Sequence, residues 1–99
     1  MLTVNKNQQD TNLTLEIIGR VDTTTAPQLE NVMEQSLDGI TELTMDLAGL
    51  EYMSSAGLRV LLMVQKKMNV QGNMKLINVN DDIMEIFEIT GFADILTIE

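Results

Sequence analysis

Hydrophobic and polar residues alternate with a two-residue period near the start of the chain. Residues 13–17 place Thr14 and Glu16 between leucine and isoleucine, which is the period of a strand with one buried face. Residues 2–7 predict a weaker strand, and the polar residues 8–12 predict a turn longer than the tightest hairpin type. The chain is therefore expected to open with an antiparallel hairpin.

A helical period of about 3.6 residues follows in residues 25–38. Thr25 and Gln28 have the spacing of a capping box, and Pro27 lies in the predicted first turn. Gly39 supplies the stop. These signals predict the first helix.

Two more helices are predicted by local start and stop residues. The second covers residues 55–69, and the glycine at 72 breaks it. The third covers residues 81–90, with Asn80 as N-cap, two aspartates in its first turn and Gly91 at its end.

Short apolar segments between these helices predict the remaining strands, at residues 43–47, 74–79 and 95–98. Strands that alternate with helices require parallel crossovers, so the opening hairpin makes the sheet mixed. We expect an α/β fold in one domain, residues 1–99, with four or five strands and three main helices. The predicted core comprises Leu15, Ile17, Leu29, Val32, Met45, Leu47, Leu58, Leu61, Leu62, Leu76, Ile83 and Phe87.

The amino-acid composition limits which catalytic, metal and cofactor sites this domain can have. The chain has no histidine and no cysteine, which excludes a Ser-His-Asp triad and predicts no metal site and no catalytic residue. Neither glycine-rich nucleotide motif occurs, so no cofactor is expected. Catalysis is disfavoured because every nucleophile lacks an identifiable base.

Charge narrows the class of partner. Six basic and fifteen acidic residues give a net charge of −9, which argues against nucleic acid and anionic lipid and favours a protein with a basic surface. The longest apolar run is too short to enter a membrane, and no secretory signal opens the chain. We therefore expect a cytoplasmic protein without membrane insertion.

The most informative segment is residues 46–62. An alternating strand passes through a short loop to Ser54, Ser55, Ala56 and Gly57, where a helix must begin. A serine at this place is commonly an N-cap. The free amides and the dipole of a helix N-terminus also favour a phosphate or another anion beside an exposed hydroxyl. Spacing alone leaves both interpretations open.

This segment resembles the core signature of STAS domains, in particular the bacterial anti-sigma factor antagonists. The matching residues are Asp46-Leu47, Tyr52-Met53 and Ser54-Ser55-Ala56-Gly57-Leu58. A second family element matches Gly19-Arg20-Val21-Asp22 with Thr25-Ala26-Pro27. The resemblance covers essentially the whole chain and implies the same order of strands and helices.

The resemblance implies a phosphorylation site and a surface that binds a protein partner. In the family, an anti-sigma factor that is itself a serine kinase phosphorylates the position that falls on Ser55. Ser54 is the second candidate, because family members often carry aspartate where this chain has a second hydroxyl. The partner-binding residues expected near this site are Asp22, Thr24, Ser54, Ser55, Ala56 and Gly57. The polar side of the second helix adds Arg59 and Met63, by their helical spacing.

Two of these residues have alternative interpretations. Asp22 ends the second strand beside a helix start, where aspartate often makes local capping bonds. Met63 lies on the polar side of the second helix between Arg59 and Lys66. It is either a docking residue or one of the isolated apolar side chains that protein surfaces normally carry.

The expected function is that of an anti-sigma factor antagonist, not an enzyme. The unphosphorylated protein would bind the anti-sigma factor, phosphorylation of Ser55 would release it, and a serine phosphatase would restore the active form. The alternative is a STAS module in a signalling scaffold, a transport complex or a small-ligand or nucleotide sensor, because fold does not determine function. The oligomeric state is open between a monomer and a weak dimer.

Overall fold

Five strands and three α-helices follow one another along residues 1–99, all of which the computed structural model describes. The strands are β1 (Leu2–Gln9), β2 (Asn12–Val21), β3 (Glu42–Asp46), β4 (Leu50–Met53) and β5 (Asn73–Ile77). The helices are α1 (Ala26–Ser36), α2 (Ser55–Gln71) and α3 (Asp81–Thr90), followed by a short 3-10 helix, η1 (Phe92–Asp94). The predicted α/β class with a mixed sheet is confirmed.

The sheet has the order β1-β2-β3-β5, and β4 pairs with the far end of β2. β1 runs antiparallel to β2, whereas the β2–β3, β2–β4 and β3–β5 pairs are parallel. The predicted hairpin is confirmed, but its turn is shorter than predicted. Pairing continues as far as Gln9 opposite Asn12, so only Asp10 and Thr11 form the turn, and Asp10 has φ 56°.

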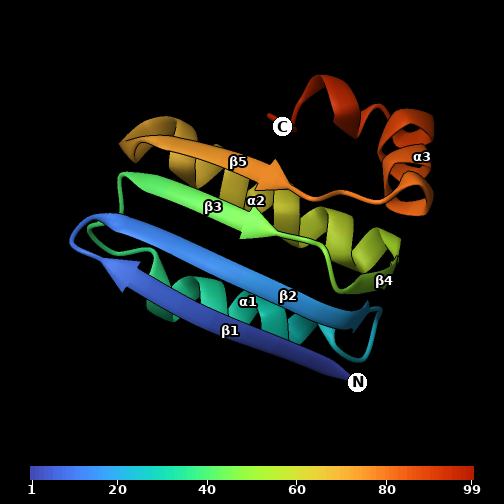
Figure 1. Ribbon diagram of the computed structural model, residues 1–99, viewed down its shortest axis with the longest axis horizontal. Coiled ribbons are helices and arrows are strands. Elements are labelled where there is room, and N and C mark those ends of the chain that lie inside the picture. Colours follow the sequence, from blue (N-terminus) through green and yellow to red (C-terminus); the bar gives the residue numbers. More distant parts are fainter.

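The two long helices cover a single face of the sheet. Figure 1 shows α1 and α2 behind the strands and α3 at the end of the sheet beside β4. β2 accordingly buries every second residue, from Leu13 to Val21, while Thr14 and Arg20 are exposed on the other face. The alternation of the sequence therefore corresponds to one helix-covered face and one polar face.

The core lies between the sheet and the helices. All predicted core residues are buried except Val32 and Leu62, which are half-buried. Both differences have the same physical reason, because each residue lies at the margin of the apolar arc of its helix. The third helix begins and ends as predicted, and Asn80 caps it by accepting a hydrogen bond from the Ile83 amide at 2.9 Å.

The predicted capping box of the first helix is wrong. Thr25 is the N-cap residue by position, but its side chain makes no cap hydrogen bond. Its hydroxyl donates instead to the Arg20 carbonyl oxygen at 2.8 Å, and Gln28 Nε2 donates to the carbonyl oxygen of Leu2 at 3.1 Å. Thr25 thus bonds back to the end of β2, and Gln28 bonds to β1, which comes near it only in the folded protein.

Two strand predictions also differ from the structure. Residues 50–53 form β4, which the sequence interpretation treated as loop. Residues 95–98 do not form a strand, because η1 precedes them and only Ile98 makes a bridge, with Leu76. The sheet thus has five strands, but β4 takes the place of the strand predicted at residues 95–98.

Candidate functional site

The start of α2 distinguishes the two adjacent serines. Ser54 has the extended backbone of an N-cap residue (φ −89°, ψ 177°), and its carbonyl oxygen accepts the first backbone bond of α2, from the Leu58 amide at 3.0 Å. Its Oγ is buried and has no hydrogen-bond partner in the protein. Ser55 is the first residue of α2 and is exposed. Only the Ser55 hydroxyl is therefore open to another molecule.

Gly57 brings this helix start close to the sheet. A Cβ atom at this position would lie 2.7 Å from Val21 Cγ1 and 2.9 Å from Met53 Cγ, distances that no packed carbon pair tolerates without movement. The absence of a side chain thus allows α2 to begin directly above the ends of β2 and β4. Ala56, beside it, is half-buried.

The loop between β2 and α1 is organised by one oxygen of Asp22. Asp22 Oδ1 accepts from the Thr24 hydroxyl at 2.7 Å, from the Thr24 amide at 2.9 Å and from the Thr25 amide at 3.0 Å. These bonds satisfy donors that precede α1, so the Asp22 side chain orders the loop before the helix, while the Gln28 amide of the first turn donates to the Thr25 carbonyl oxygen at 3.0 Å. Thr24 itself is exposed.

The same bonds keep Asp22 ionised. The hydrogen bond from the Thr24 hydroxyl, followed by that from the Thr25 amide, lowers the pKa of Asp22 from 3.8 to about 2. The other oxygen, Oδ2, makes no hydrogen bond and lies 4.0 Å from Arg20 Nε, while the Arg20 guanidinium stacks 4.5 Å above the ring of Tyr52. Asp22 therefore orders the loop with Oδ1 and pairs with Arg20 through Oδ2.

The fold brings the two family elements together. The Ser54 amide donates to the Val21 carbonyl oxygen at 2.8 Å, so the first residues of α2 lie directly beside the Asp22 loop. Arg59, one turn further along α2, lines a hollow of about 280 Å³ together with Thr23 and Glu30. Met63 does not join this group, because it lies a further turn along α2 and lines a separate hollow.

Sequence reasoning missed several residues around this site. Thr23 and Glu30 face the hollow beside Arg59, and the Arg20–Tyr52 stack stands next to Asp22. Glu30 and Glu34 are one turn apart on the predicted first helix, a spacing that already placed two carboxylates on one side. The stack had no such signal, since a β-bulge between Gly19 and Arg20 sets Arg20 opposite Tyr52.

The arrangement suits binding rather than catalysis. It combines an exposed hydroxyl at a helix N-terminus, an ionised carboxylate and a flanking hollow, but it provides no general base for Ser55. No group of three or more potential metal-ligating side chains is present.

Comparison with known families gives this site its class. The STAS domain family model matches residues 3–99, so the chain belongs to the STAS family. It is 40% identical to BtrV of Bordetella bronchiseptica over 82 residues, which cover 81% of this chain and 71% of that protein. It is 32% identical to the anti-sigma-B factor antagonist of Listeria monocytogenes over 97 residues, covering 95% and 84%. Members of this class are binding proteins and not enzymes.

Solved structures show the same fold. An anti-sigma factor antagonist from Mycobacterium paratuberculosis superposes with a TM-score of 0.89 at 21% identity, covering 99% of this chain and 85% of that one. SpoIIAA of Bacillus in its phosphorylated form gives a TM-score of 0.75 at 15% identity, covering 98% and 91%. None of the helices of this chain has the length and apolar character needed to cross a membrane.

Proposed function

We propose that this chain is a phosphorylation-switched anti-sigma factor antagonist that acts in the cytoplasm. In its unphosphorylated form it binds an anti-sigma factor that is also a serine kinase. Phosphorylation of Ser55 releases that partner, and a serine phosphatase returns the chain to its binding form. The observation that carries the proposal is the exposed Ser55 hydroxyl at the start of α2, beside the ionised Asp22 and next to a buried Ser54 Oγ.

The comparisons support this role without testing the switch. Relatives at 30% identity or more are named anti-sigma factor antagonists, and SpoIIAA, which shares the fold, has been solved both phosphorylated and unphosphorylated. The fold alone does not select this role, since a sulfate transporter family protein from Wolinella succinogenes shares it. The relatives by sequence therefore favour the antagonist over the transport alternative.

The switch follows from where a phosphate on Ser55 would lie. It would add a charge of about −1.5 to −2 to a surface that already holds the Asp22 carboxylate, on a chain of net charge −9. The helix N-terminus favours the new anion locally, because the amides before Leu58 have no helical acceptor. The fold should consequently persist. The partner, however, would have to desolvate a dianion within the contact surface.

Substitutions at Ser55 test the switch. We expect Ser55→Ala to bind the anti-sigma factor persistently and to resist phosphorylation. Ser55→Asp should remain folded and bind at least about tenfold more weakly, which corresponds to about 1.4 kcal/mol. The affinities are measured by titration calorimetry against the purified serine-kinase anti-sigma factors encoded in the same genome, and phosphate is located by mass spectrometry.

Ser54→Ala is the matched control. Because Ser54 Oγ is buried and unbonded, we expect this variant to bind and to be phosphorylated as the wild type is. Equal affinities for wild type, Ser55→Ala and Ser55→Asp, with no phosphate on either serine, would refute the switch. Loss of phosphorylation in Ser54→Ala with retention in Ser55→Ala would move the acceptor to Ser54.

A further inference from the structure

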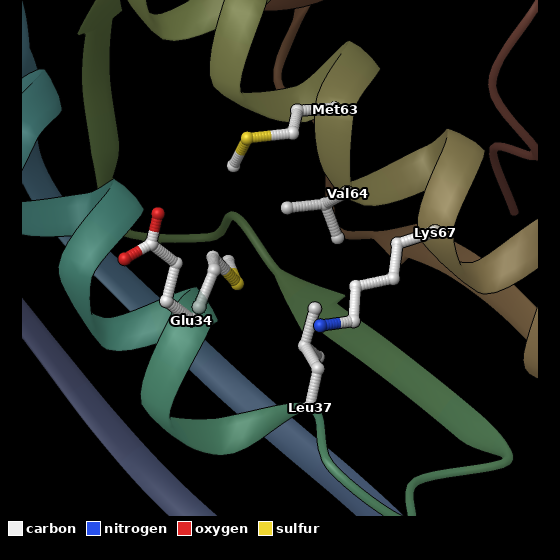
Figure 2. A pocket seen from close by; sticks show the side chains of 6 residues that line it. Glu34, Leu37, Met63, Val64 and Lys67 are labelled. Atoms are coloured by element: carbon white, nitrogen blue, oxygen red, sulfur yellow. The ribbon is translucent and has the colours of Figure 1, made fainter.

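The contact between α1 and α2 is hollowed at two places along its length. The first hollow, beside Ser55, is lined by Pro27 and Glu30 of α1 and by Arg59 and Val60 of α2, among others. The second has a volume of about 210 Å³ and is shown in Figure 2. It is lined by Met33, Glu34, Leu37, Met63, Val64 and Lys67. We call the two hollows together the α1–α2 groove.

The groove follows both helices in the same direction. From Glu30 to Glu34 on α1, and from Arg59 to Met63 on α2, the lining residues advance by one helical turn from the first hollow to the second. The lining of α1 extends from residue 26 to residue 37, a rise of about 16 Å at 1.5 Å per residue. That length corresponds to about three turns of a helix laid along the groove.

The second hollow has an apolar floor and charged rims. Met33, Leu37 and Val64 are buried beneath it, whereas Met63 remains 38% exposed at its edge. Figure 2 shows the side chains of Glu34 from α1 and Lys67 from α2 on opposite sides of the hollow. An occupant must therefore present apolar side chains to the floor and opposite charges to the two rims.

The charges of the groove are available to a partner. The acidic residues Glu30 and Glu34 line the α1 side, and the basic residues Arg59 and Lys67 line the α2 side. None of them is in an ion pair, since the two ion pairs of the molecule are Arg20–Asp22 and Lys75–Glu99. The two glutamates are about one helical turn apart on α1, and the two basic residues are about two turns apart on α2.

The far end of the groove is held by the half-buried amide of Gln71. Gln71 Nε2 donates to the carbonyl oxygens of Leu37 at 2.7 Å and Ile40 at 2.6 Å. These bonds tie the end of α2 to the end of α1, so the separation of the two walls does not depend on an occupant. A preformed groove loses less conformational entropy on binding.

We propose that the α1–α2 groove receives an amphipathic helix of the anti-sigma factor, which extends the contact surface that begins at Ser55. The apolar stripe of that helix lies on Met33, Leu37, Met63 and Val64. Its basic residues face Glu30 and Glu34, and its acidic residues face Arg59 and Lys67. This inference rests on the proposed function, because it assigns a second contact to the same partner.

Size and position favour this occupant over a small molecule. The second hollow, at about 210 Å³, is below the roughly 300 Å³ at which pockets for drug-sized ligands begin. It suits one large side chain of a helix whose neighbouring turns lie along the rest of the groove. The groove also starts where the candidate phosphorylation site ends, since Ala56 lines its first hollow.

Methionine methyl resonances test the groove directly. The chain contains eight methionines; Met33 and Met63 line the groove, Met53 precedes Ser54, and Met84 lies on α3. The wild-type chain, labelled at its methionine methyl groups, is titrated with each purified serine-kinase anti-sigma factor from the same genome. We expect the Met33, Met53 and Met63 signals to shift or broaden, and that of Met84 to stay in place.

This measurement separates the two proposals. A response at Met53 without one at Met33 and Met63 would overturn the groove and leave the proposed function standing. No response at any methionine with any of these factors would overturn both. A response at Met33 and Met63 to a small-molecule fragment library, but not to a factor, would assign the groove to a ligand and overturn the inference.

Paired substitutions supply the second measurement. We expect Lys67→Glu to weaken binding at least tenfold and Lys66→Glu, its neighbour outside the groove, less than threefold. Met63→Ala should weaken binding at least fivefold, whereas Val70→Ala, at a residue 90% exposed on the same helix, should not. Equal losses for Lys66→Glu and Lys67→Glu would indicate general charge attraction and overturn the groove.

Discussion

At the scale of single residues, two serines that are neighbours in the sequence lie in different environments. Ser54 is the N-cap of α2 and Ser55 is its first residue, yet the Oγ of Ser54 is buried without a partner and Ser55 is exposed. The two oxygens of Asp22 also differ, since Oδ1 accepts hydrogen bonds from the loop and Oδ2 lies 4.0 Å from Arg20 Nε. The serine that carries the proposed switch is therefore the one whose side chain is exposed.

The lowered pKa of Asp22 predicts a pH-dependent contribution to stability. Because the pKa falls from 3.8 to about 2 on folding, the contribution is complete above about pH 4 and is lost as the pH falls through 2. We expect Asp22→Asn to melt below the wild type at pH 5 and to approach it at pH 2. Thermal melts of both proteins across this range are the measurement.

Thr24→Val is the control for this prediction. It removes the hydrogen bond that lowers the pKa of Asp22 most, so its loss of stability on acidification should be smaller than that of the wild type and should end at a higher pH. A constant difference in melting temperature between Asp22→Asn and the wild type at every pH would show that the charge of Asp22 does not contribute.

At the scale of secondary-structure elements, α2 depends on close contact with the sheet at its first turn. Gly57 lies against Val21 of β2 and Met53 of β4, and the Ser54 amide bonds to Val21. The same contacts position both family elements on one surface. The stability of the helix start and the geometry of the candidate site are therefore coupled.

Gly57→Ala should destabilise the domain. Its methyl group would lie 2.7 Å from Val21 Cγ1, and Val21 is β-branched and cannot move aside easily. We expect a loss of about 1–3 kcal/mol in the free energy of unfolding, the usual cost of overpacking, measured by urea denaturation. The control is Ser55→Ala, at an exposed neighbouring position, which should cost about 0.5 kcal/mol or less. If Gly57→Ala were as stable as Ser55→Ala, the close packing of Gly57 would be contradicted.

At the scale of the whole molecule, repulsion between carboxylates opposes compactness. The chain has a net charge of −9, and its two ion pairs, at 3.9 and 4.0 Å, are between exposed or half-buried side chains. Such pairs contribute little, so unbalanced negative charge dominates the electrostatics of the fold.

Added salt should therefore stabilise this protein. Screening shortens the range of repulsion from about 30 Å at 0.01 M to about 3 Å at 1 M. We expect the melting temperature to rise by about 3–6 °C between 0.01 and 0.5 M sodium chloride, equivalent to somewhat under 1 kcal/mol for a domain of this size. Calorimetric scans at neutral pH are the measurement. A falling melting temperature would show that attractive pairs outweigh the repulsion.

The sequence by itself determined the elements whose signals are local. The alternation of residues 13–17 and the residues Asn80 and Gly91 predicted β2 and α3, because a strand face and a helix cap involve neighbours within a few residues. The family resemblance also identified the serines at the start of α2 and Asp22 as candidate site residues. That Asp22 lies near these serines, however, was implied by the resemblance and not by their spacing in the sequence.

Only the tertiary structure decided the features that depend on contacts distant in sequence. β4 buries both its ends and exposes its middle, so no two-residue period marked it, and it exists through its pairing with β2. Gln28 does not complete a capping box because its amide group bonds to Leu2 of β1, and the Ser54 hydroxyl loses access because the helix start packs on β2 and β4. The α1–α2 groove likewise requires two helices to lie side by side, which no single amphipathic pattern specifies.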